Sequence, residues 1–287
     1  MKPTTASGSR VYSSQVLDRV VRILASFSPD RQELRLIQIA EAAGLHKSTC
    51  YRLLEAMRTH GLIGLNETAG TYHPGMKLFE LGSLAVGRLK LDKYAHPLLE
   101  DLSRVTGETA HLCVLDGSDV VYVAKVESNR ALRIPSAVGA RNPAYCTGVG
   151  KAMLAHLAPE QLDAYLSESQ LRAFTKKTLV SAFELKANLR QIVTQGYAID
   201  DQEREEGVRC VAAPVRDHAG QVVAAVSIAG PSMRVTKERV PDLAAHVIRA
   251  AAEISSELGH RSINHTANGD KPGRNGRALP RLSGGMR

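Results

Sequence analysis

Three amphipathic segments follow one another in the first sixty residues. In SSQVLDRVVRILASF (13–27) apolar residues recur with helical spacing, and Ser13 or Ser14 stands where an N-cap is expected. LIQIAEAAG (36–44) predicts a second, short helix that ends at Gly44, and HKSTCYRLLEAMRTHG (46–61) predicts a third that ends at Gly61. Two helices joined by so short a turn form the helix-turn-helix arrangement.

The third predicted helix has two different sides. At about 100° per residue, one side carries the apolar positions Cys50, Leu53, Leu54, Ala56 and Met57. The other side is polar, and in a helix-turn-helix the first turns of the second helix meet base edges and phosphates in the major groove. On an isolated helix such a side would simply be solvated. We expect the DNA-contacting residues to be Lys47, Ser48, Thr49, Tyr51, Arg52 and Arg58.

The segments that follow favour the DNA-binding interpretation. GLIGLNETAGTYHPG (61–75) predicts a small hairpin across the polar turn NETAG, and a hairpin directly after a recognition helix is a wing. KLFELGSLAVGRLK (77–90) has helical spacing and predicts a linker helix.

Beyond the linker the periodicity changes from helical to alternating. A helix is expected at 92–106, followed by a hairpin over 111–127 around Asp116-Gly117. A second hairpin is expected over 208–230, and helices are expected at 148–166, 184–196 and 236–258. Antiparallel strands with inserted and appended helices predict an α+β domain.

The charge is unevenly distributed along the 287 residues. The whole chain carries +8, with 12 Lys and Arg against 7 Asp and Glu in 1–90, and 6 against 1 in 260–287. Between them the balance is nearly neutral, at 19 against 21. Basic ends suggest a polyanionic partner. The Gly-, Asn- and Arg-rich tail (262–287) is expected to be disordered, and it could touch phosphates or be an inert extension.

Composition also excludes several classes of protein. The sequence has no apolar run near the roughly 18 residues of a membrane span, and its first ten residues lack an apolar signal core. Four widely spaced cysteines argue against a zinc site or a disulfide framework. We therefore expect a cytoplasmic protein without membrane contact, metal or cofactor.

Three segments carry a resemblance to a known family. IAEAAGLHKSTCYRLLEAM, VGARNPAYCTGVGKAMLA and EEGVRCVAAPVRDHAGQVVAAVSIAGP resemble the IclR-type (isocitrate-lyase-regulator type) bacterial transcriptional regulators, in the same order and spacing. The resemblance covers roughly residues 13–260 and implies a winged helix-turn-helix domain (13–75), a linker helix (76–91) and a GAF-like effector-binding domain (92–260). Outside it we expect a disordered N-terminus (1–12) and a disordered basic tail (261–287). The resemblance further implies a homodimer or dimer of dimers on palindromic operator DNA, usually as a repressor, controlled by a small organic acid.

A glycine-rich turn, TGVGKAMLA (147–155), is the candidate effector site. It is not a P-loop, because Tyr145 stands where that motif needs Gly and Ala152 where it needs Ser or Thr. The first N–H groups of a helix lack internal partners and favour an anion. Lys151, in the first helical turn, could attract the effector or point into water.

The resemblance assigns roles to particular residues around this turn. It implies that Gly148 and Val149 offer backbone N–H groups to a carboxylate, and that Cys210 and Ser227 add side-chain donors. Asp200 would accept a hydrogen bond from the effector, and Ile134 would form an apolar wall. Strand alternation places Cys210 and Ser227 on buried faces, where both could equally be small core residues.

Two other functions compete with regulation. Cys210 could be an enzyme's nucleophile, but this needs a base within reach, and His218 is expected in a turn far along the strand. Alternatively, the basic tail could bind nucleic acid without sequence preference.

Overall fold

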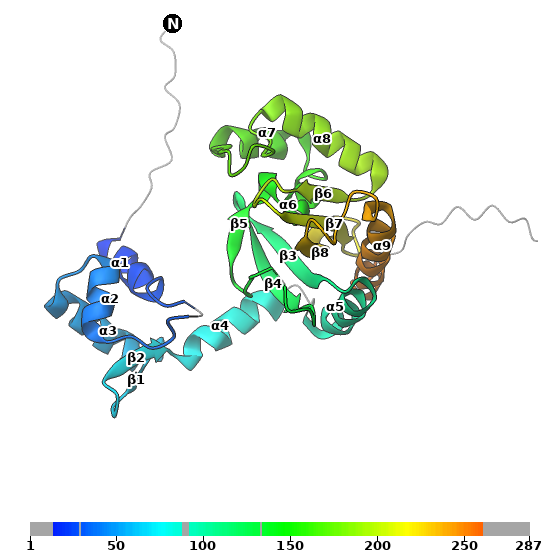
Figure 1. Ribbon diagram of the computed structural model, residues 1–287. Helices are drawn as coiled ribbons and strands as arrows, with labels where there is room; N and C mark the ends of the chain where they lie inside the picture. Colours follow the sequence, from blue (N-terminus) through cyan, green and yellow to red (C-terminus); the bar gives the residue numbers. More distant parts are fainter. Residues whose placement is uncertain (1–13, 29, 88–91, 133, 261–287) are drawn as a thin grey trace, which may run out of the picture.

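The structure is a computed structural model that describes residues 14–28, 30–87, 92–132 and 134–260. Two units follow each other along the chain, joined through helix α4 (Met76–Gly87) (Figure 1). The predicted order of a helical N-terminal unit followed by an α+β unit is confirmed. The expectations for 1–12, the tail and the last residues of the linker helix fall outside the described residues.

The N-terminal unit contains three helices and a hairpin. The helices are α1 (Gln15–Leu24), α2 (Leu36–Ala43) and α3 (Lys47–Thr59), and Ser14 is the N-cap of α1. Gly44 and Gly61 adopt the left-handed conformation that ends α2 and α3, as expected from the sequence. The hairpin pairs β1 (Ile63–Asn66) with β2 (Thr71–Pro74).

The core of this unit joins all three helices to the wing. Ile23 from α1, Ile39 from α2 and Leu54 from α3 are fully buried. Leu34, in the loop before α2, exchanges two backbone hydrogen bonds with Tyr72 of β2, at 2.8 and 3.0 Å. The wing is therefore bonded to the segment that starts the helix-turn-helix.

The C-terminal unit contains a six-stranded antiparallel sheet, in the order β5-β4-β3-β8-β7-β6. Two long hairpins form its centre and were expected from the sequence. The strands are β3 (Thr109–Asp116), β4 (Asp119–Val126), β5 (Arg141–Pro143), β6 (Ala198–Asp201), β7 (Val208–Arg216) and β8 (Val222–Pro231).

Helices cover both faces of this sheet (Figure 1). On one face α5 (Asp92–Thr106) and α9 (Val240–Glu257) pack over alternate residues of β7 and β8 such as Val211 and Val226. On the other face lie α6 (Gly148–Leu154), α7 (Pro159–Glu168) and α8 (Ala182–Gln195). The period of two along each strand thus sends neighbouring side chains into different cores.

The second face holds the glycine-rich turn. A short 3₁₀ helix (Ala144–Cys146) leads into α6, and Thr147 caps α6 by accepting a hydrogen bond from Gly150 N–H at 3.2 Å. A Cβ on Gly150 would lie 2.1 Å from the Ala144 carbonyl oxygen. Only glycine fits there without displacing the preceding turn.

Two sequence predictions were wrong in detail. The helix expected over 148–166 is two helices, because Pro159 begins α7 and lacks the N–H that a continuous helix requires. The final helix starts at Val240 rather than at 236. The edge strands β5 and β6 were not predicted, since three or four residues show too little alternation to be recognised.

Candidate nucleic-acid interface and ligand cavity

The polar side of α3 is exposed along its whole length. Cys50, Leu54 and Met57 on the opposite side are at most 3 % exposed and anchor the helix in the core. Of the six candidate contact residues, Thr49 is half-buried and the other five are exposed: Lys47, Ser48, Tyr51, Arg52 and Arg58. The structure therefore presents the candidates together on one surface, with the helix held from behind.

Contacts within this surface differ from residue to residue. The His46 ring caps α3, since its Nδ1 accepts a hydrogen bond from Ser48 N–H at 3.4 Å and lies 2.9 Å from Ser48 Oγ. Arg58 pairs with Glu55 at 3.4 Å. Within the part of the chain that the structure describes, the side chains of Lys47 and Arg52 show neither a hydrogen bond nor an ion pair. These two cations are the freest to meet phosphates or base edges.

A cavity of about 270 Å³ lies in the C-terminal unit. All six residues that the resemblance had implied for the effector line it: Ile134, Gly148, Val149, Asp200, Cys210 and Ser227. They come from five separate segments of the chain, which the sheet and α6 bring together.

Strand pairing explains how three of these residues meet. Asp200 on β6 is directly opposite Cys210 on β7, and Ser227 on β8 is opposite Ala212, two residues along β7 from Cys210. Side chains two positions apart on one strand share a face. The three polar groups therefore lie on the face that α6 covers, and we call them, with Gly148 and Val149, the floor of the cavity.

The Cys210 thiol is held by its neighbours on this floor. Burial raises its pKa to about 12, although hydrogen bonds with Ser227 and with the Gly148 backbone N–H act in the opposite direction. A thiol with a raised pKa is a poor nucleophile, because the thiolate is the reactive form. The surroundings of Cys210 thus disfavour a nucleophilic role.

Asp200 is the acidic group of the floor and is only 5 % exposed. Its Oδ1 accepts hydrogen bonds from the backbone N–H groups of Glu203, at 2.7 Å, and Arg204, at 3.4 Å. Burial nevertheless raises the pKa of this carboxyl to about 7, with the nearby Glu203 contributing in the same direction. Near neutral pH Asp200 can therefore either donate or accept a hydrogen bond.

Lys151 lies beneath the cavity in a position that the sequence did not suggest. Its side chain is 1 % exposed and forms an ion pair with Glu203, which is itself 7 % exposed. Of the two earlier options for Lys151, the solvent is wrong, because the side chain is buried. Its charge is paired with the carboxylate of Glu203, and it is not among the residues that line the cavity. Burial raises the pKa of Glu203, and the Lys151 ammonium opposes this rise.

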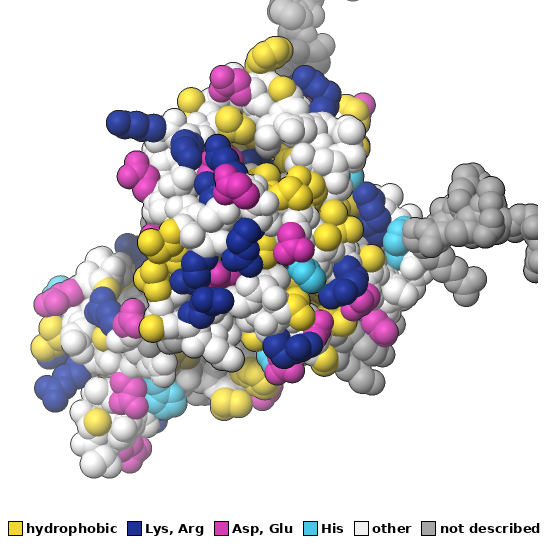
Figure 2. Space-filling model, turned by 45° about the vertical axis from the view of Figure 1, so that its right-hand side comes forward, with side chains coloured by type: hydrophobic (Ala, Val, Ile, Leu, Met, Phe, Trp, Pro, Cys, Tyr) yellow, Lys and Arg dark blue, Asp and Glu magenta, His cyan; other side chains and the backbone are white. Residues whose placement is uncertain are grey.

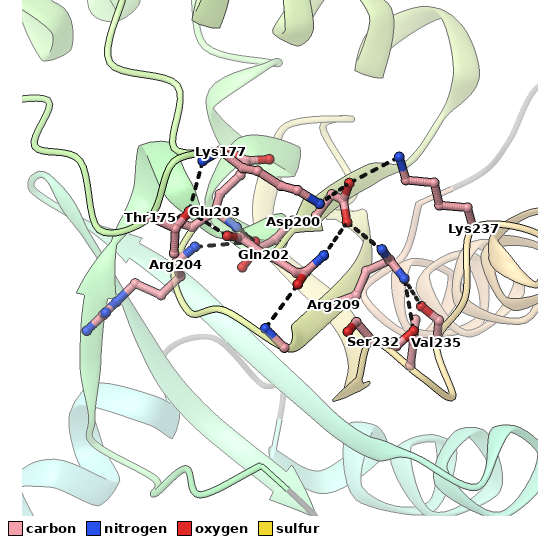
Figure 3. A network of polar contacts seen from close by, with 12 residues as sticks. Thr175, Lys177, Asp200, Gln202, Glu203, Arg204, Arg209, Ser232, Val235 and Lys237 are labelled. Carbon is pink, nitrogen blue, oxygen red and sulfur yellow. Dashed lines mark hydrogen bonds and ion pairs between the residues drawn. The ribbon is translucent and has the colours of Figure 1, made fainter.

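The loop between β6 and β7 is fixed from both sides (Figure 3). Thr178 Oγ1 donates to the Glu203 carbonyl at 2.6 Å, and Thr175 Oγ1 donates to the Gln202 carbonyl at 2.7 Å. On the other side Arg209 bonds to Asp201 at 2.5 Å. These contacts hold the backbone between Asp200 and Arg204 in a defined shape at the cavity.

Sequence reasoning missed the polar wall of the cavity. His111, Ser136, Tyr122, Asn142 and Arg204 line it as well. His111 Nε2 lies 2.8 Å from Ser136 Oγ, and its ring meets Tyr122 edge-on with centroids 5.1 Å apart. Burial, followed by the Lys125 charge, lowers the pKa of His111 to about 3, so the ring is neutral. The sequence signal of His111 and Tyr122 was a polar residue inside an apolar strand, which does not identify a partner. Ser136 and Arg204 lie in loops and had no such signal.

Among the residues that the structure describes, no cluster of His, Cys, Asp and Glu side chains could hold a metal ion. None of the described helices is both long enough and apolar enough to span a bilayer.

Comparison with known protein families gives two matches. A model described as "IclR helix-turn-helix domain" matches residues 16–66. A second, described as "Bacterial transcriptional regulator IclR C-terminal", matches residues 83–256, which is more than half of the chain.

Individual relatives agree with these matches. The chain is 38 % identical over 246 residues to the HTH-type transcriptional regulator XynR of Escherichia coli, covering 86 % of this chain and 98 % of that protein. It is 35 % identical over 260 residues to the transcriptional repressor IclR of E. coli, covering 90 % and 95 %. A crystal structure of an IclR homolog from Microbacterium hydrocarbonoxydans, complexed with 4-hydroxybenzoate, superposes with a TM-score of 0.74 at 28 % identity, covering 85 % and 99 %.

Proposed function

The chain belongs to the IclR family of bacterial transcriptional regulators, and from this premise we propose that α3 contacts an operator while the Asp200 cavity binds a small carboxylate that controls this contact. The protein is a DNA-binding regulator with an effector domain, and its relatives include repressors. It is not an enzyme. As DNA is its target, we place its action in the cytoplasm.

The observation that carries the DNA-binding proposal is the two-sided burial of α3. Its apolar side is closed in the core, while Lys47, Ser48, Tyr51 and Arg52 stand exposed in its first two turns. In a helix-turn-helix these turns enter the major groove, where Arg reads guanine edges and hydroxyls bind phosphates. Thr49, half-buried, and Arg58, further along the helix, would contribute from the edges of the surface.

DNase footprinting on the DNA flanking the protein's own gene tests this assignment. The wild type should protect a palindromic site at physiological salt, and Arg52→Ala should lose that protection. Arg190→Ala, which changes an exposed arginine on α8, should footprint like the wild type. If all three proteins coat the DNA without preference and dissociate with added salt, the binding is nonspecific.

The observation that carries the effector proposal is the convergence of polar groups on one cavity. The N–H of Val149, the thiol of Cys210 and the hydroxyl of Ser227 can meet a carboxylate, and Asp200 can accept from a second polar group. Ile134 adds an apolar side to the cavity. A relative has been crystallised with 4-hydroxybenzoate, which supports an acid about the size of that molecule as the effector.

The same footprint becomes the assay for the effector. Acetate, pyruvate, benzoate and 4-hydroxybenzoate are added in turn, and at least one should weaken or strengthen protection at millimolar concentration or below. Ser227→Ala removes the hydroxyl without adding volume to this buried position, so it should reduce that response without altering the footprint itself. A footprint that ignores all four acids would exclude control by these monocarboxylates.

We further propose that the protein acts as a homodimer or a dimer of dimers. Met76, Phe79 and Leu84 on α4 are 68 to 70 % exposed, and Val16 and Leu17 on α1 are 58 and 61 % exposed. Apolar side chains grouped in this way mark surfaces that associate. Sedimentation of Phe79→Glu should show a smaller species than the wild type, and an unchanged mass would place the contact elsewhere.

A further inference from the structure

Arg204 is a cation in the cavity wall whose guanidinium is positioned by two neighbours. Its Nε donates to Asn142 Oδ1 at 2.9 Å, and its guanidinium carbon lies 4.3 Å from the centre of the Phe174 ring. Figure 3 shows the side chain extending from the β6–β7 loop on the side opposite Arg209. An arginine held by stacking and by one hydrogen bond still has four N–H donors to offer.

The other charged groups at the cavity are matched or peripheral. Arg141 also lines the wall, but it pairs with Asp116 at 2.7 Å and with Asp119 at 3.3 Å. Lys151 is neutralised by Glu203 beneath the floor. Glu205 lines the cavity as well, and it is exposed to solvent at the rim.

Arg204 differs from these groups because its charge has no acidic partner. Among the described residues it forms no ion pair with a carboxylate, although it lines a cavity with several polar side chains. Guanidinium groups often bind carboxylates through two parallel, charge-assisted hydrogen bonds, which are roughly twice as strong as neutral ones. The wall therefore contains an acid-binding group separate from the floor.

We propose that Arg204 selects effectors that carry a second acidic group, so that the preferred ligands are small dicarboxylic acids with one carboxylate at the floor and the other on the guanidinium. This inference rests on the proposed function, because it assumes that the cavity binds a carboxylate at all. It adds the class of ligand and the residue that distinguishes a diacid from a monoacid of equal length.

Asp200 is compatible with an anion at the floor. An ionised Asp200 would repel a carboxylate bound to Val149 N–H, whereas its protonated form can donate to it. Because burial raises the pKa of Asp200 to about 7, the protonated form is available near neutral pH. A diacid would then place its two charges against a neutral floor and a cationic wall.

Calorimetric titration of the full chain at pH 6 with matched pairs of acids tests the proposal. The pairs are butyrate with succinate, valerate with glutarate, and benzoate with terephthalate, which differ within each pair by one carboxylate. The proteins are the wild type, Arg204→Gln, Arg204→Lys and the surface control Arg190→Gln.

The wild type and Arg190→Gln should bind the diacid of at least one pair about tenfold or more tightly than the monoacid, the size expected for charged hydrogen bonds. Arg204→Gln should lose that preference while keeping its affinity for the monoacid. Arg204→Lys should keep part of it, since it retains the charge without the planar fork. Thermal unfolding of each variant shows whether the fold is intact.

The possible failures can be told apart. If monoacids bind as tightly as diacids in the wild type, or if the preference survives in Arg204→Gln, the role of Arg204 is overturned and the carboxylate cavity stands. If none of the six acids, nor any acid of the footprinting panel, binds the wild type, the proposed effector class itself fails.

Discussion

The two candidate sites use polar residues in opposite ways. On α3 the polar side chains are exposed, and Lys47 and Arg52 stand apart from acidic partners within the described structure. In the C-terminal unit, Asp200 of the cavity and the neighbouring Lys151–Glu203 pair are less than a tenth exposed, and their charges depend on each other. Figure 2 shows a third situation, with acidic and basic side chains interspersed over the outer face of the C-terminal unit.

This difference determines what each site can tolerate. Replacing an exposed cation changes the stability of the free protein little, because water solvates the charge there. The replacement removes only the contact with DNA. A buried charge is paired or its ionisation is suppressed, since removing it from water is costly. We therefore expect mutations of the exposed cations on α3 to affect binding alone, and mutations of the buried charges near the cavity to affect stability first.

The largest expected effect comes from breaking the buried ion pair. Lys151→Met leaves the Glu203 carboxylate buried without its partner, and should lower the free energy of unfolding by about 3–5 kcal/mol. Urea unfolding followed by circular dichroism measures the loss. The double variant Lys151→Met with Glu203→Leu should recover most of it. A single variant as stable as the wild type would show that the pair is not buried.

The next effect is a pH dependence caused by Asp200. Its folded pKa of about 7 lies above the value of 3.8 for a free carboxyl. Between pH 3.8 and pH 7 the folded state therefore keeps a proton on Asp200 that the unfolded state has lost. The stability that Asp200 contributes is therefore lost as pH rises from about 4 to about 7, at up to about 1.4 kcal/mol per pH unit. Asp200→Asn removes this dependence and should be more stable than the wild type at pH 8.

His111 acts in the opposite direction over part of the same range. Its pKa falls from 6.5 to about 3 on folding, so its contribution to stability grows as pH rises between these values. The informative quantity is consequently the difference in unfolding free energy between the wild type and Asp200→Asn at each pH, because the His111 contribution cancels. A difference that stays constant from pH 5 to pH 8 would contradict the raised pKa of Asp200.

A smaller effect, on DNA affinity, is expected at the exposed site on α3. Arg52→Ala should weaken specific DNA binding by about 1–3 kcal/mol if the residue reads a base edge, with unchanged unfolding. Arg58→Ala should cost less and should lower the salt dependence by about one unit, as for a phosphate contact made by a residue already engaged with Glu55. Titrations at three salt concentrations separate the two. Equal losses would assign both arginines to phosphates.

The smallest effects are expected from removing the N-caps of α3 and α6, the helices of the two candidate sites. Thr147 caps α6 from a buried position, and Thr147→Ala should destabilise the protein by about 1 kcal/mol. His46 caps α3 from an exposed position with a hydrogen bond of 3.4 Å, and His46→Ala should cost less. Thermal unfolding of both variants gives the order, and a larger loss at His46 would reverse the comparison.

The sequence predicted the structure best where the helical or strand repeat determines which side of an element is buried. The helical repeat in α3 separated Cys50 and Leu54 from Lys47 and Arg52, because a residue's side follows from its position in the turn alone. Ala56 is an exception: it lies exposed at the edge of the apolar side. Strand alternation likewise assigned Cys210 and Ser227 to a buried face.

The polar contacts around the cavity could not be predicted from local sequence patterns, because they join segments that are far apart in the chain. Lys151 meets Glu203 across 52 positions of the chain, and Arg204 meets Asn142 across 62. No local pattern carries such a pairing, so reasoning from the helix dipole sent Lys151 to the effector or to water. The six floor and wall positions came from a family resemblance, and Arg204 lay outside it.

Gly150 has a consequence for how this protein can vary. The carbonyl of Ala144 occupies the space that a side chain at position 150 would need. In a saturation mutagenesis library, substitutions at this position should therefore disappear under any selection for folded protein, with or without an effector present. At Gly148 the obstacle is the Cys210 sulfur, 2.9 Å from where a Cβ would stand, and a smaller residue at 210 can compensate. Neighbouring glycines of one turn would thus leave different evolutionary records: one position invariant, the other covarying with position 210.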